Sequence, residues 1–405
     1  EQETQQSKML SIFLVVVSFA SLVAPLDNTL ALTPAMGYNT WNDYQCDVSA
    51  DDIKLAADTM VKQGLPELGY NYVNLDDCWA VGRDEQGVII PDPIRFPDGI
   101  APVADYVHSL GLKFGIYTDR GNQTCQKRPG SLHYEQIDAE TYASWGVDYL
   151  KEDSCHATQI HREAFKEYAT MRDALNSTGR PIYFSLCGWF AWYAPEGAEL
   201  GNSWRISQDC TGWQSTLRAI DTNVGLEIYA GPGSWNDPDM LIGSASTTKF
   251  TLTQHQSRAM FSMWSVMSAP LLIGSNIRNL SSWDLETYTN DEVIAVDQDS
   301  LGRQGIRLAG GDLMGLLSPN EETNVWGRPL SSGGWAVVFL NDKRVYADVT
   351  CDADCFAQMN LGSVVAVRDL WAHTNNGTTS TQSYTVYNIP PTGGFSMVRF
   401  DPPQQ

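Results

Sequence analysis

The sequence has few basic residues for its length. It carries 26 Lys and Arg against 48 Asp and Glu, so its formal net charge is −22 at pH 7. No stretch of the chain gathers Lys and Arg into a basic stripe. Because binding to a nucleic-acid backbone depends on such a stripe, we expect no nucleic-acid partner.

The motifs of several enzyme classes are absent from the chain. It has no Gly-x-Gly-x-x-Gly and no P-loop, the glycine-rich turns that hold dinucleotides and nucleotide phosphates. It has no Gly-x-Ser-x-Gly, and its 6 His are scattered, which disfavours a Ser-His-Asp hydrolase. No Cys-x-x-Cys pair or His cluster has the spacing of a zinc site. We therefore expect catalysis without a metal and without a cofactor.

One apolar run, residues 9–24, follows Lys8 and leads into small residues. It is too short to favour a membrane-spanning helix, and its pattern is typical of a signal peptide. We assign residues 1–31 to a signal peptide and leader, with cleavage between residues 20 and 31. We therefore expect no membrane anchor. We expect passage through the secretory pathway to the extracellular space, or to a vacuole or lysosome.

Eight cysteines follow this leader. They are Cys46, Cys78, Cys125, Cys155, Cys187, Cys210, Cys351 and Cys355. An even number of cysteines behind a signal peptide indicates disulfide bonds. Four Asn-x-Ser/Thr sequons, at Asn122, Asn176, Asn279 and Asn376, fit a glycoprotein.

Residues 32–305 alternate short apolar runs with longer segments of helical period. The candidate strands are 70–75, 113–117, 147–151, 181–186, 204–207 and 271–274, and the clearest helices are 49–63, 138–145 and 162–176. This alternation predicts either an α/β barrel or a doubly wound sheet. Acidic residues follow most of the strands, and no glycine-rich turn follows the first. Both features favour a TIM barrel, whose active site lies at the carboxyl ends of its strands.

The pattern changes after residue 305. Short β-like runs at 335–340, 348–349, 364–371, 383–387 and 394–400 are separated by Gly, Asn, Ser and Pro, with no clear helical period. Residues 306–405 are therefore predicted to form a small antiparallel β domain.

The segment around Asp153 carries the clearest chemical signal. Retaining glycoside hydrolysis needs two carboxyl groups about 5–5.5 Å apart, one as nucleophile and one as proton donor. Side chains alternate along a strand, so Lys151 and Asp153 share one face and Glu152 takes the other. A cation on that face lowers the pKa of Asp153 and keeps it ionised, as a nucleophile requires. A structural ion pair at a strand end would give the same pattern.

Two further segments supply carboxylates. Asp209 closely follows Trp204 and Arg205, and it suits a proton donor if burial and the charge of Asp153 raise its pKa. The alternative is an Asp that caps the next helix. Asp76 and Asp77 follow another strand, where paired carboxylates can each accept two hydroxyls of one sugar. A metal site is the alternative there.

Seven motifs together identify a family. LTPAMGYNTWN, LDDCW, FGIYTD, YLKEDSC, NSWRISQD, WNDPDML and SAPLLIG occur in this order. The chain resembles glycoside hydrolase family 27 of clan D, the α-galactosidase (melibiase) and α-N-acetylgalactosaminidase family, from residue 32 to about residue 402. The resemblance implies a (β/α)8 barrel followed by an antiparallel β-sandwich.

The resemblance also implies an activity. It is the exo-acting removal of terminal non-reducing α-D-galactose from oligosaccharides, polysaccharides or glycoconjugates. The reaction retains configuration through a covalent galactosyl-enzyme. The expected partner is therefore a galactose-containing carbohydrate. An α-N-acetylgalactosaminidase is the alternative within the family, and a non-catalytic galactose-binding protein is the alternative outside the enzymes. The oligomeric state is open, with a homodimer among the alternatives.

Residue roles follow from the family motifs. Asp153 corresponds to the nucleophile, Asp209 to the acid/base, and the pair Asp76 and Asp77 to the carboxylates that hold the galactose 4- and 6-hydroxyls. The other expected substrate-binding residues are Trp41, Tyr117, Cys125, Lys151, Cys155, Gly188, Trp189 and Arg205. The family disulfides would join Cys46 to Cys78 and Cys125 to Cys155.

The chain departs from the family pattern at Gly188. Many members carry Glu or Asn there to read the 2-position of the sugar, and N-acetylgalactosaminidases carry Ser. Gly188 either opens space for an N-acetyl group or leaves a gap that Trp192 or Tyr193 fills. Two cysteine pairings also stay open here, Cys187 with Cys210 and Cys351 with Cys355.

Overall fold

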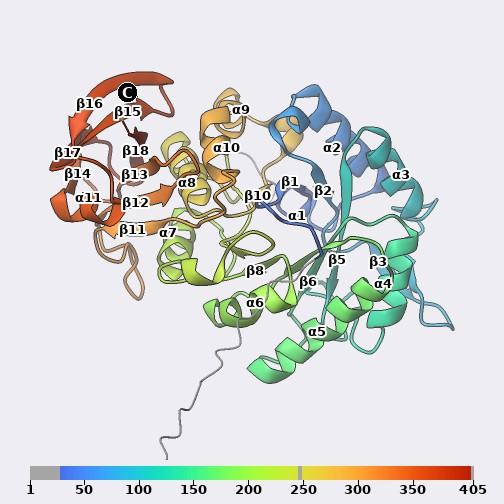
Figure 1. Ribbon diagram of the computed structural model, residues 1–405. Helices are drawn as coiled ribbons and strands as arrows, with labels where there is room; N and C mark the ends of the chain where they lie inside the picture. Colours follow the sequence, from blue (N-terminus) through green and yellow to red (C-terminus); the bar gives the residue numbers. More distant parts are fainter. Residues whose placement is uncertain (1–27, 245–248, 403–405) are drawn as a thin grey trace, which may run out of the picture.

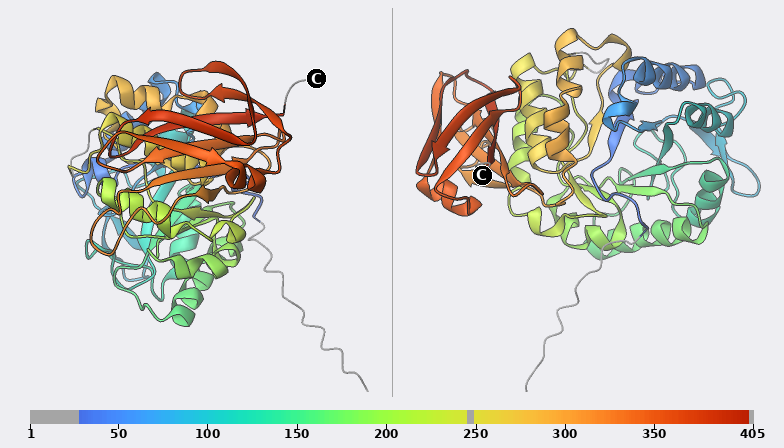
Figure 2. Two further views of the ribbon diagram at one scale, coloured as in Figure 1. Left: turned by 90° about the vertical axis from the view of Figure 1, so that its left-hand side faces the viewer. Right: turned by 45° about the horizontal axis from the view of Figure 1, so that its top comes forward.

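A computed structural model describes residues 28–244 and 249–402 of the chain (Figure 1). The predicted signal peptide lies almost wholly outside the described residues. No helix in the described part is long and apolar enough to cross a membrane. The chain folds into an α/β body and a smaller β domain, which lies against one side of it (Figures 1 and 2).

Eight parallel strands form the centre of the α/β body. In sheet order they are β10 (Leu271–Ile273), β1 (Met36–Asn39), β2 (Tyr72–Asn74), β5 (Lys113–Asp119), β6 (Tyr149–Asp153), β7 (Tyr183–Leu186), β8 (Ser203–Arg205) and β9 (Trp235–Asp237). Leu241, just after β9, forms a parallel bridge with Ile273. The Leu241 backbone N–H donates to the Leu272 carbonyl at 2.8 Å. The sheet is therefore closed into a barrel, as predicted.

Helices surround this barrel (Figure 1). They are α1 (Trp41–Tyr44), α2 (Ala50–Lys62), α3 (Ala101–Ser109), α4 (Glu135–Ser144), α5 (His161–Ser177), α6 (Ala194–Leu200), α7 (Trp213–Thr222), α8 (Gln254–Val266), α9 (Ser282–Tyr288) and α10 (Asp291–Asp297). Single 3-10 turns occur at Pro66–Leu68, Ala191–Tyr193, Glu227–Tyr229 and Ile277–Asn279. A short hairpin, β3 (Ala80–Arg83) and β4 (Ile89–Pro91), follows β2.

Helix α2 illustrates how the sequence specifies the helices around the barrel. Ser49 and Asp52 form a reciprocal capping box at its start. Ile53, Ala56 and Met60 recur at helical spacing and are fully buried. The three predicted helices and all six predicted barrel strands form, with shifts of a few residues at their ends. Strands β1 and β9 were not predicted because they are short and carry polar residues, so they lack an apolar run.

The C-terminal domain is a β-sandwich, as predicted. One antiparallel sheet has the order β11 (Ile306–Ala309), β12 (Thr323–Pro329), β13 (Trp335–Asn341), β18 (Gly394–Asp401), β15 (Val364–Asp369) and β16 (Thr374–Ser380). The second contains β14 (Ala347–Asp352) and β17 (Ser383–Ile389). Phe339 and Phe400 of the first sheet contact Tyr384 of the second, with ring centroids 5.7 and 5.2 Å apart.

One helix in this domain contradicts the expectation that residues 306–405 lack helical structure. Helix α11 (Ala353–Met359) has two turns and follows β14 directly. The Asp352 carboxylate accepts a hydrogen bond from the Cys355 N–H at 3.0 Å, and a disulfide joins Cys351 to Cys355. A helix this short has no sequence period to detect, and its N-cap and disulfide stabilise it locally.

A buried cation joins the two domains. The Arg328 side chain, on β12, is fully buried, and it donates to the carbonyls of Arg303 at 2.9 Å, Ser265 at 3.2 Å and Asp297 at 2.7 Å, as well as to that of Val296. These carbonyls belong to the ends of α8 and α10 and to the segment before β11. Arg328 thus satisfies carbonyls at helix ends that have no partner within their own helix.

We expect Arg328→Met to destabilise the protein by about 3 kcal/mol, because several buried carbonyls would lose their donor. The measurement is urea unfolding followed by fluorescence, which also reports whether the domains unfold together. The matched control is Arg344→Met, which removes an exposed arginine paired with Glu321. The control should leave the unfolding midpoint nearly unchanged. Equal effects of the two substitutions would contradict the assigned role of Arg328.

Candidate active site

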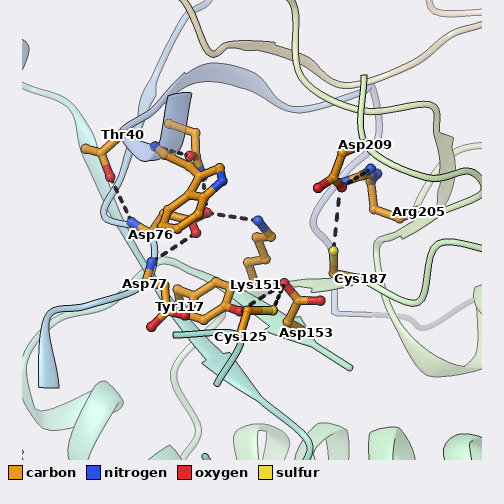
Figure 3. A network of polar contacts seen from close by, with 12 residues as sticks. Thr40, Asp76, Asp77, Tyr117, Cys125, Lys151, Asp153, Cys187, Arg205 and Asp209 are labelled. Atoms are coloured by element: carbon orange, nitrogen blue, oxygen red, sulfur yellow. Dashed lines mark hydrogen bonds and ion pairs between the residues drawn. The ribbon is translucent and has the colours of Figure 1, made fainter. Parts of the chain in front are cut away.

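One pocket opens where the carboxyl ends of the barrel strands meet (Figure 3). It is lined by Trp41, Asn42, Asp76, Asp77, Tyr117, Cys125, Gln126, Lys151, Asp153, Cys155, Cys187, Trp189, Arg205, Asp209, Cys210, Asp239, Met240 and Phe250. Every predicted catalytic and substrate-binding residue except Gly188 lines it. The parallel strands bring together residues that lie far apart in the sequence, as the barrel prediction requires.

Strand β6 delivers two charged side chains to this pocket. The Lys151 ammonium lies 2.9 Å from the Asp76 carboxylate and 5.1 Å from the centre of the Tyr117 ring. Lys151 therefore forms its direct ion pair with Asp76 on β2 rather than with Asp153. Asp153 is held differently, because its carboxylate accepts hydrogen bonds from the Tyr117 hydroxyl and the Ser154 N–H, both at 2.9 Å.

The expectation that Lys151 leaves Asp153 with a lowered pKa is wrong for the unliganded protein. Asp153 is only 5% exposed, and this burial raises its pKa. The charge of Lys151 and the two hydrogen bonds lower it, but by less. Burial also raises the pKa of the neighbouring Asp119 to about 7, with a further contribution from the charge of Asp153. Desolvation by burial, with a smaller contribution from the charge of Asp76, outweighs the single nearby cation.

Asp209 lies at the exposed side of the pocket, with a side chain that is 64% exposed. It does not cap the next helix, because the N-cap of α7 is Gly212. Its carboxylate accepts a hydrogen bond from Arg205 Nη2 at 3.0 Å (Figure 3). Partial burial raises the pKa of Asp209, but the charges of Arg205 and Lys151 and this hydrogen bond lower it more. The pKa is thus lowered here, whereas a proton donor requires a raised one.

Asp76 and Asp77 are both buried and fixed by hydrogen bonds. Asp76 accepts from Asn39 Nδ2 at 2.9 Å in addition to its ion pair with Lys151. Asp77 accepts from the Gln126 N–H at 3.0 Å, and burial raises its pKa to about 6. Two carboxylates from one strand end therefore face the same pocket as acceptors for hydroxyl groups.

The cysteines separate into three disulfides and two free thiols. Cys46–Cys78 and Cys125–Cys155 form as the family resemblance implied, and Cys351–Cys355 forms as well. Cys187 and Cys210 are free and buried, so the open question of their pairing is answered against a disulfide. Both free thiols line the pocket, on either side of Arg205 in the sequence.

One group of side chains has the proximity of a metal site. Ligand atoms of Asp119, Cys125, Asp153 and Cys155 all lie within 4.8 Å of one another. The two sulfurs form a disulfide, which offers no thiolate to a metal. Asp119 already accepts from the N–H groups of Gly121 and Cys155, each at 2.7 Å. The donor set that remains is two hydrogen-bonded carboxylates, which does not fit a dedicated metal centre.

Gly188 does not open space in the pocket wall. A Cβ atom at this position would overlap the ring of Tyr193, which is fully buried. Trp192 stacks on Tyr193 with ring centroids 3.8 Å apart, and Arg120 donates to the Tyr193 hydroxyl at 3.3 Å. Of the two possibilities at Gly188, the structure supports the filled gap, with Tyr193 in it and Trp192 behind. Gly188 itself is absent from the pocket lining, although its neighbours Cys187 and Trp189 both belong to it.

Several lining residues were not predicted. Cys187, Asp239 and Met240 lie in or beside sequence motifs that follow strands, so strand-end position was an available signal. Phe250 lies in a long segment between β9 and α8 and carries no such signal. Asp239 contacts Arg205 from the opposite side to Asp209, with 2.9 Å between Nη1 and Oδ1.

Glu152 lies on the other face of β6, as strand alternation predicts. It is fully buried and is absent from the pocket lining. Within the described residues neither of its carboxylate oxygens has a hydrogen-bond partner. Burial therefore raises the pKa of Glu152 well above its ordinary value, and the charge of Arg120 offsets this only in part. Burial therefore favours the protonated form of Glu152.

Comparisons with known proteins agree on one relationship. The sequence model described as "Alpha galactosidase A" matches residues 33–299, and that described as "Alpha galactosidase C-terminal beta sandwich domain" matches residues 320–397. A probable α-galactosidase of Dictyostelium discoideum is 41% identical over 401 residues, which cover 98% of this chain and 99% of that protein.

Two further relatives are also named as α-galactosidases. The α-galactosidase of Cyamopsis tetragonoloba is 44% identical over 360 residues, covering 87% of this chain and 83% of that protein. The solved structure of α-galactosidase from Saccharomyces cerevisiae with raffinose superposes with a TM-score of 0.83 at 29% identity. The superposed region covers 94% of this chain and 100% of the Saccharomyces cerevisiae chain.

We expect Glu152→Gln to stabilise the protein at about pH 7. The unfolded chain ionises Glu152 above about pH 4.3, whereas burial raises its pKa in the folded state, so its contribution makes stability fall as pH rises. The amide has no proton to lose, so the gain should vanish near pH 4. The unfolding temperature measured across this pH range tests it, with Glu140→Gln, on the exposed surface of α4, as control. A variant that is less stable than the wild type at pH 7 would contradict the neutral assignment.

Proposed function

The chain belongs to the α-galactosidase family of glycoside hydrolases, and on that premise we propose that Asp153 is its nucleophile and Asp209 its general acid and base. The protein is a retaining α-galactosidase. One observation carries the residue assignment. A buried carboxylate, fixed by two hydrogen bonds, shares one pocket with an exposed carboxylate on a neighbouring part of the rim.

In the first step an Asp153 oxygen attacks the anomeric carbon of the bound galactoside. The bond from that carbon to the leaving oxygen breaks, and its electron pair goes to the oxygen, which takes the proton of Asp209. The hydrogen bonds from Tyr117 and Ser154 hold the Asp153 carboxylate in one orientation, so little reorganisation is needed for attack. The product is a galactosyl ester of Asp153 and a released alcohol.

In the second step Asp209, now ionised, takes a proton from a water molecule. The water oxygen bonds to the anomeric carbon, and the bond to Asp153 breaks, which restores both carboxyl groups. The exposure of Asp209 supports this role, because leaving group and water both reach it. A bound substrate covers Asp209, and this added burial raises its pKa toward the value that a proton donor requires.

Recognition of the sugar rests on the opposite wall. Asp76 and Asp77 supply buried acceptors for the 4- and 6-hydroxyls, and Lys151 fixes Asp76 through their ion pair. Trp41 supplies an aromatic surface at the pocket, which suits the apolar face of a pyranose. Hydrogen-bond acceptors of this kind discriminate strongly, because a sugar without the matching hydroxyl leaves them unpaired.

The filled gap at Gly188 supports galactose over N-acetylgalactosamine. The resemblance implies that residue 188 reads the 2-position of the sugar. In this chain the ring of Tyr193 occupies that space and is held by stacking and by Arg120. A ring packed in this way leaves no open space beside residue 188 for an N-acetyl group.

We propose residues 32–305 as the catalytic unit and residues 306–405 as the associated β domain. The proposed substrates are galactose-containing carbohydrates. Two disulfides in the barrel support passage through an oxidising secretory compartment. The signal peptide, the final compartment and a homodimeric state stay predictions.

Asp153→Asn should lower kcat on nitrophenyl α-galactoside by more than about a thousandfold, because an amide does not form the glycosyl ester. Galactose binding, measured by calorimetry, should persist. Asp119→Asn is the matched control, since it changes a neighbouring carboxylate that forms no bond to the substrate in this mechanism, and it should lose far less activity. Substantial turnover by the Asp153 variant would refute its role as nucleophile.

Wild-type protein should hydrolyse nitrophenyl α-galactoside at least about tenfold faster, in kcat/KM, than its N-acetyl analogue. Tyr193→Ala should narrow this ratio by removing the ring beside Gly188, provided that the variant remains folded by circular dichroism. Tyr193→Phe keeps the ring and loses only the hydroxyl, so it should retain the wild-type ratio. A wild-type preference for the N-acetyl substrate would overturn the choice of sugar.

A further inference from the structure

The Arg205 guanidinium contacts two carboxylates at once. Nη2 donates to Asp209 at 3.0 Å, and Nη1 lies 2.9 Å from Asp239. The two contacts differ in environment, because the Asp239 side chain is 5% exposed whereas that of Asp209 is 64% exposed. The buried contact with Asp239 therefore fixes the position of the guanidinium. The exposed contact places the guanidinium beside Asp209, the proposed proton donor.

Asp239 holds the peptide that carries Asp209 as well as the cation beside it. Its Oδ2 accepts a hydrogen bond at 2.7 Å from the N–H of Cys210, the residue directly after Asp209. The Asp239 carboxylate thus fixes the guanidinium that contacts Asp209 and also the peptide bond that follows Asp209. Among the residues described, Asp239 is the one that contacts both of these groups.

The backbone at Asp239 is strained and held by several contacts. Its φ angle is 109°, in a region that non-glycine residues rarely adopt. Its N–H donates to the Asp237 carboxylate at 2.8 Å, and its carbonyl accepts from Trp264 Nε1 at 2.7 Å. Strain of this kind persists where surrounding contacts enforce it, and it is concentrated at functional sites.

We propose that Asp239 is a positioning residue for the proton donor. It holds Arg205 and the Cys210 peptide in place, and it partly neutralises the positive charge that Asp209 faces. This inference rests on the proposed role of Asp209 and extends it. Asp239 does not itself transfer the proton, and it acts on the reaction through Arg205.

The charged groups around Asp209 decide the direction of the effect. Arg205 from β8 and Lys151 from β6 favour its ionised form. The carboxylates of Asp237 and Asp239, after β9, and the free thiols of Cys187 and Cys210 complete the titratable surroundings. When Asp239 loses its charge, the charge of Arg205 acts on Asp209 without compensation, and Asp209 loses its proton at lower pH.

The first test is the pH profile of kcat/KM for Asp239→Asn with raffinose as substrate. The amide oxygen still accepts from the Cys210 N–H, so this variant removes mainly the charge. The alkaline limb of the profile, which reports loss of the proton from the donor, should move to lower pH by about one unit. An unmoved limb, or a limb at higher pH, would overturn the proposal.

The second test separates proton donation from general damage to the site. A dinitrophenyl galactoside has a leaving group that needs no proton, whereas raffinose does need one. Asp239→Asn should lower kcat/KM on raffinose by at least about tenfold and on the dinitrophenyl substrate by less than about threefold. Equal losses on the two substrates would show a merely structural role.

A single substitution in this ion pair leaves one buried charge unpaired, which can prevent folding. The double variant Arg205→Gln/Asp239→Asn removes both charges and avoids this problem. Arg205→Gln alone should move the alkaline limb to higher pH, and adding Asp239→Asn should then move it down by less than Asp239→Asn does in the wild type. An equal downward shift in both backgrounds would show that Asp239 does not act through Arg205.

The control is Asp342→Asn, which changes a buried carboxylate that accepts from Trp213 at the domain interface. It should leave the limb in place, and a shift equal to that of Asp239→Asn would overturn the specific role of Asp239. Failure of the proposed function would look different. In that case Asp209→Ala would keep full activity on raffinose, whatever the Asp239 variants do.

Discussion

Two cations with little exposed surface, each close to two carboxylates, organise the carboxyl-terminal rim of the barrel. Lys151 lies against Asp76 and also acts on Asp153, and Arg205 lies between Asp209 and Asp239. Removing so many carboxylates from water is costly, and each cation offsets part of that cost. For Asp153 the effect of burial is larger than that of the cation, so its pKa stays raised. For Asp209 the charges of Arg205 and Lys151 outweigh burial, so its pKa is lowered.

In the proposed mechanism, the pKa values of Asp153 and Asp209 change when the substrate binds. In this mechanism a bound galactoside covers the exposed carboxylate of Asp209 and brings hydroxyl donors to Asp76 and Asp77. Burial then favours a proton on Asp209, and neutralising contacts at the opposite wall leave more of the Lys151 charge to act on Asp153. In the proposed mechanism, binding of the substrate therefore shifts both pKa values in the direction that the reaction requires.

The loops of the rim are fixed by covalent and packing constraints that differ from strand to strand. Cys46–Cys78 and Cys125–Cys155 tie segments next to Asp77 and Asp153. Behind β7 an aromatic ring, Tyr193, takes the place that a side chain at residue 188 would occupy. Away from the pocket, Arg328 holds the β domain against the ends of barrel helices through their carbonyls. The two disulfides and the packed Tyr193 ring constrain the segments beside the rim, and the proposed mechanism depends on carboxylates held in fixed positions.

Much of this protein was readable from the sequence, because local periodicity and strand-end chemistry are properties of short segments. The helix at Ala50–Lys62, six of the eight barrel strands, the shared face of Lys151 and Asp153, and the opposite orientation of Glu152 all follow from periods of 3.6 and 2. The strands β1 and β9, the helix α11 and the lining residue Phe250 did not, since they are short or lie in irregular segments.

The sequence by itself determined which residue types are available at the rim, and its motifs determined the family and predicted the two catalytic carboxylates. Only the tertiary structure decided which groups meet. It paired Lys151 with Asp76, divided Arg205 between Asp209 and Asp239, left Cys187 and Cys210 unjoined, and filled the gap at Gly188 with Tyr193. The reason is physical. Burial and the distances between separate strands set pKa values and contacts, and neither quantity is a property of a local stretch of sequence.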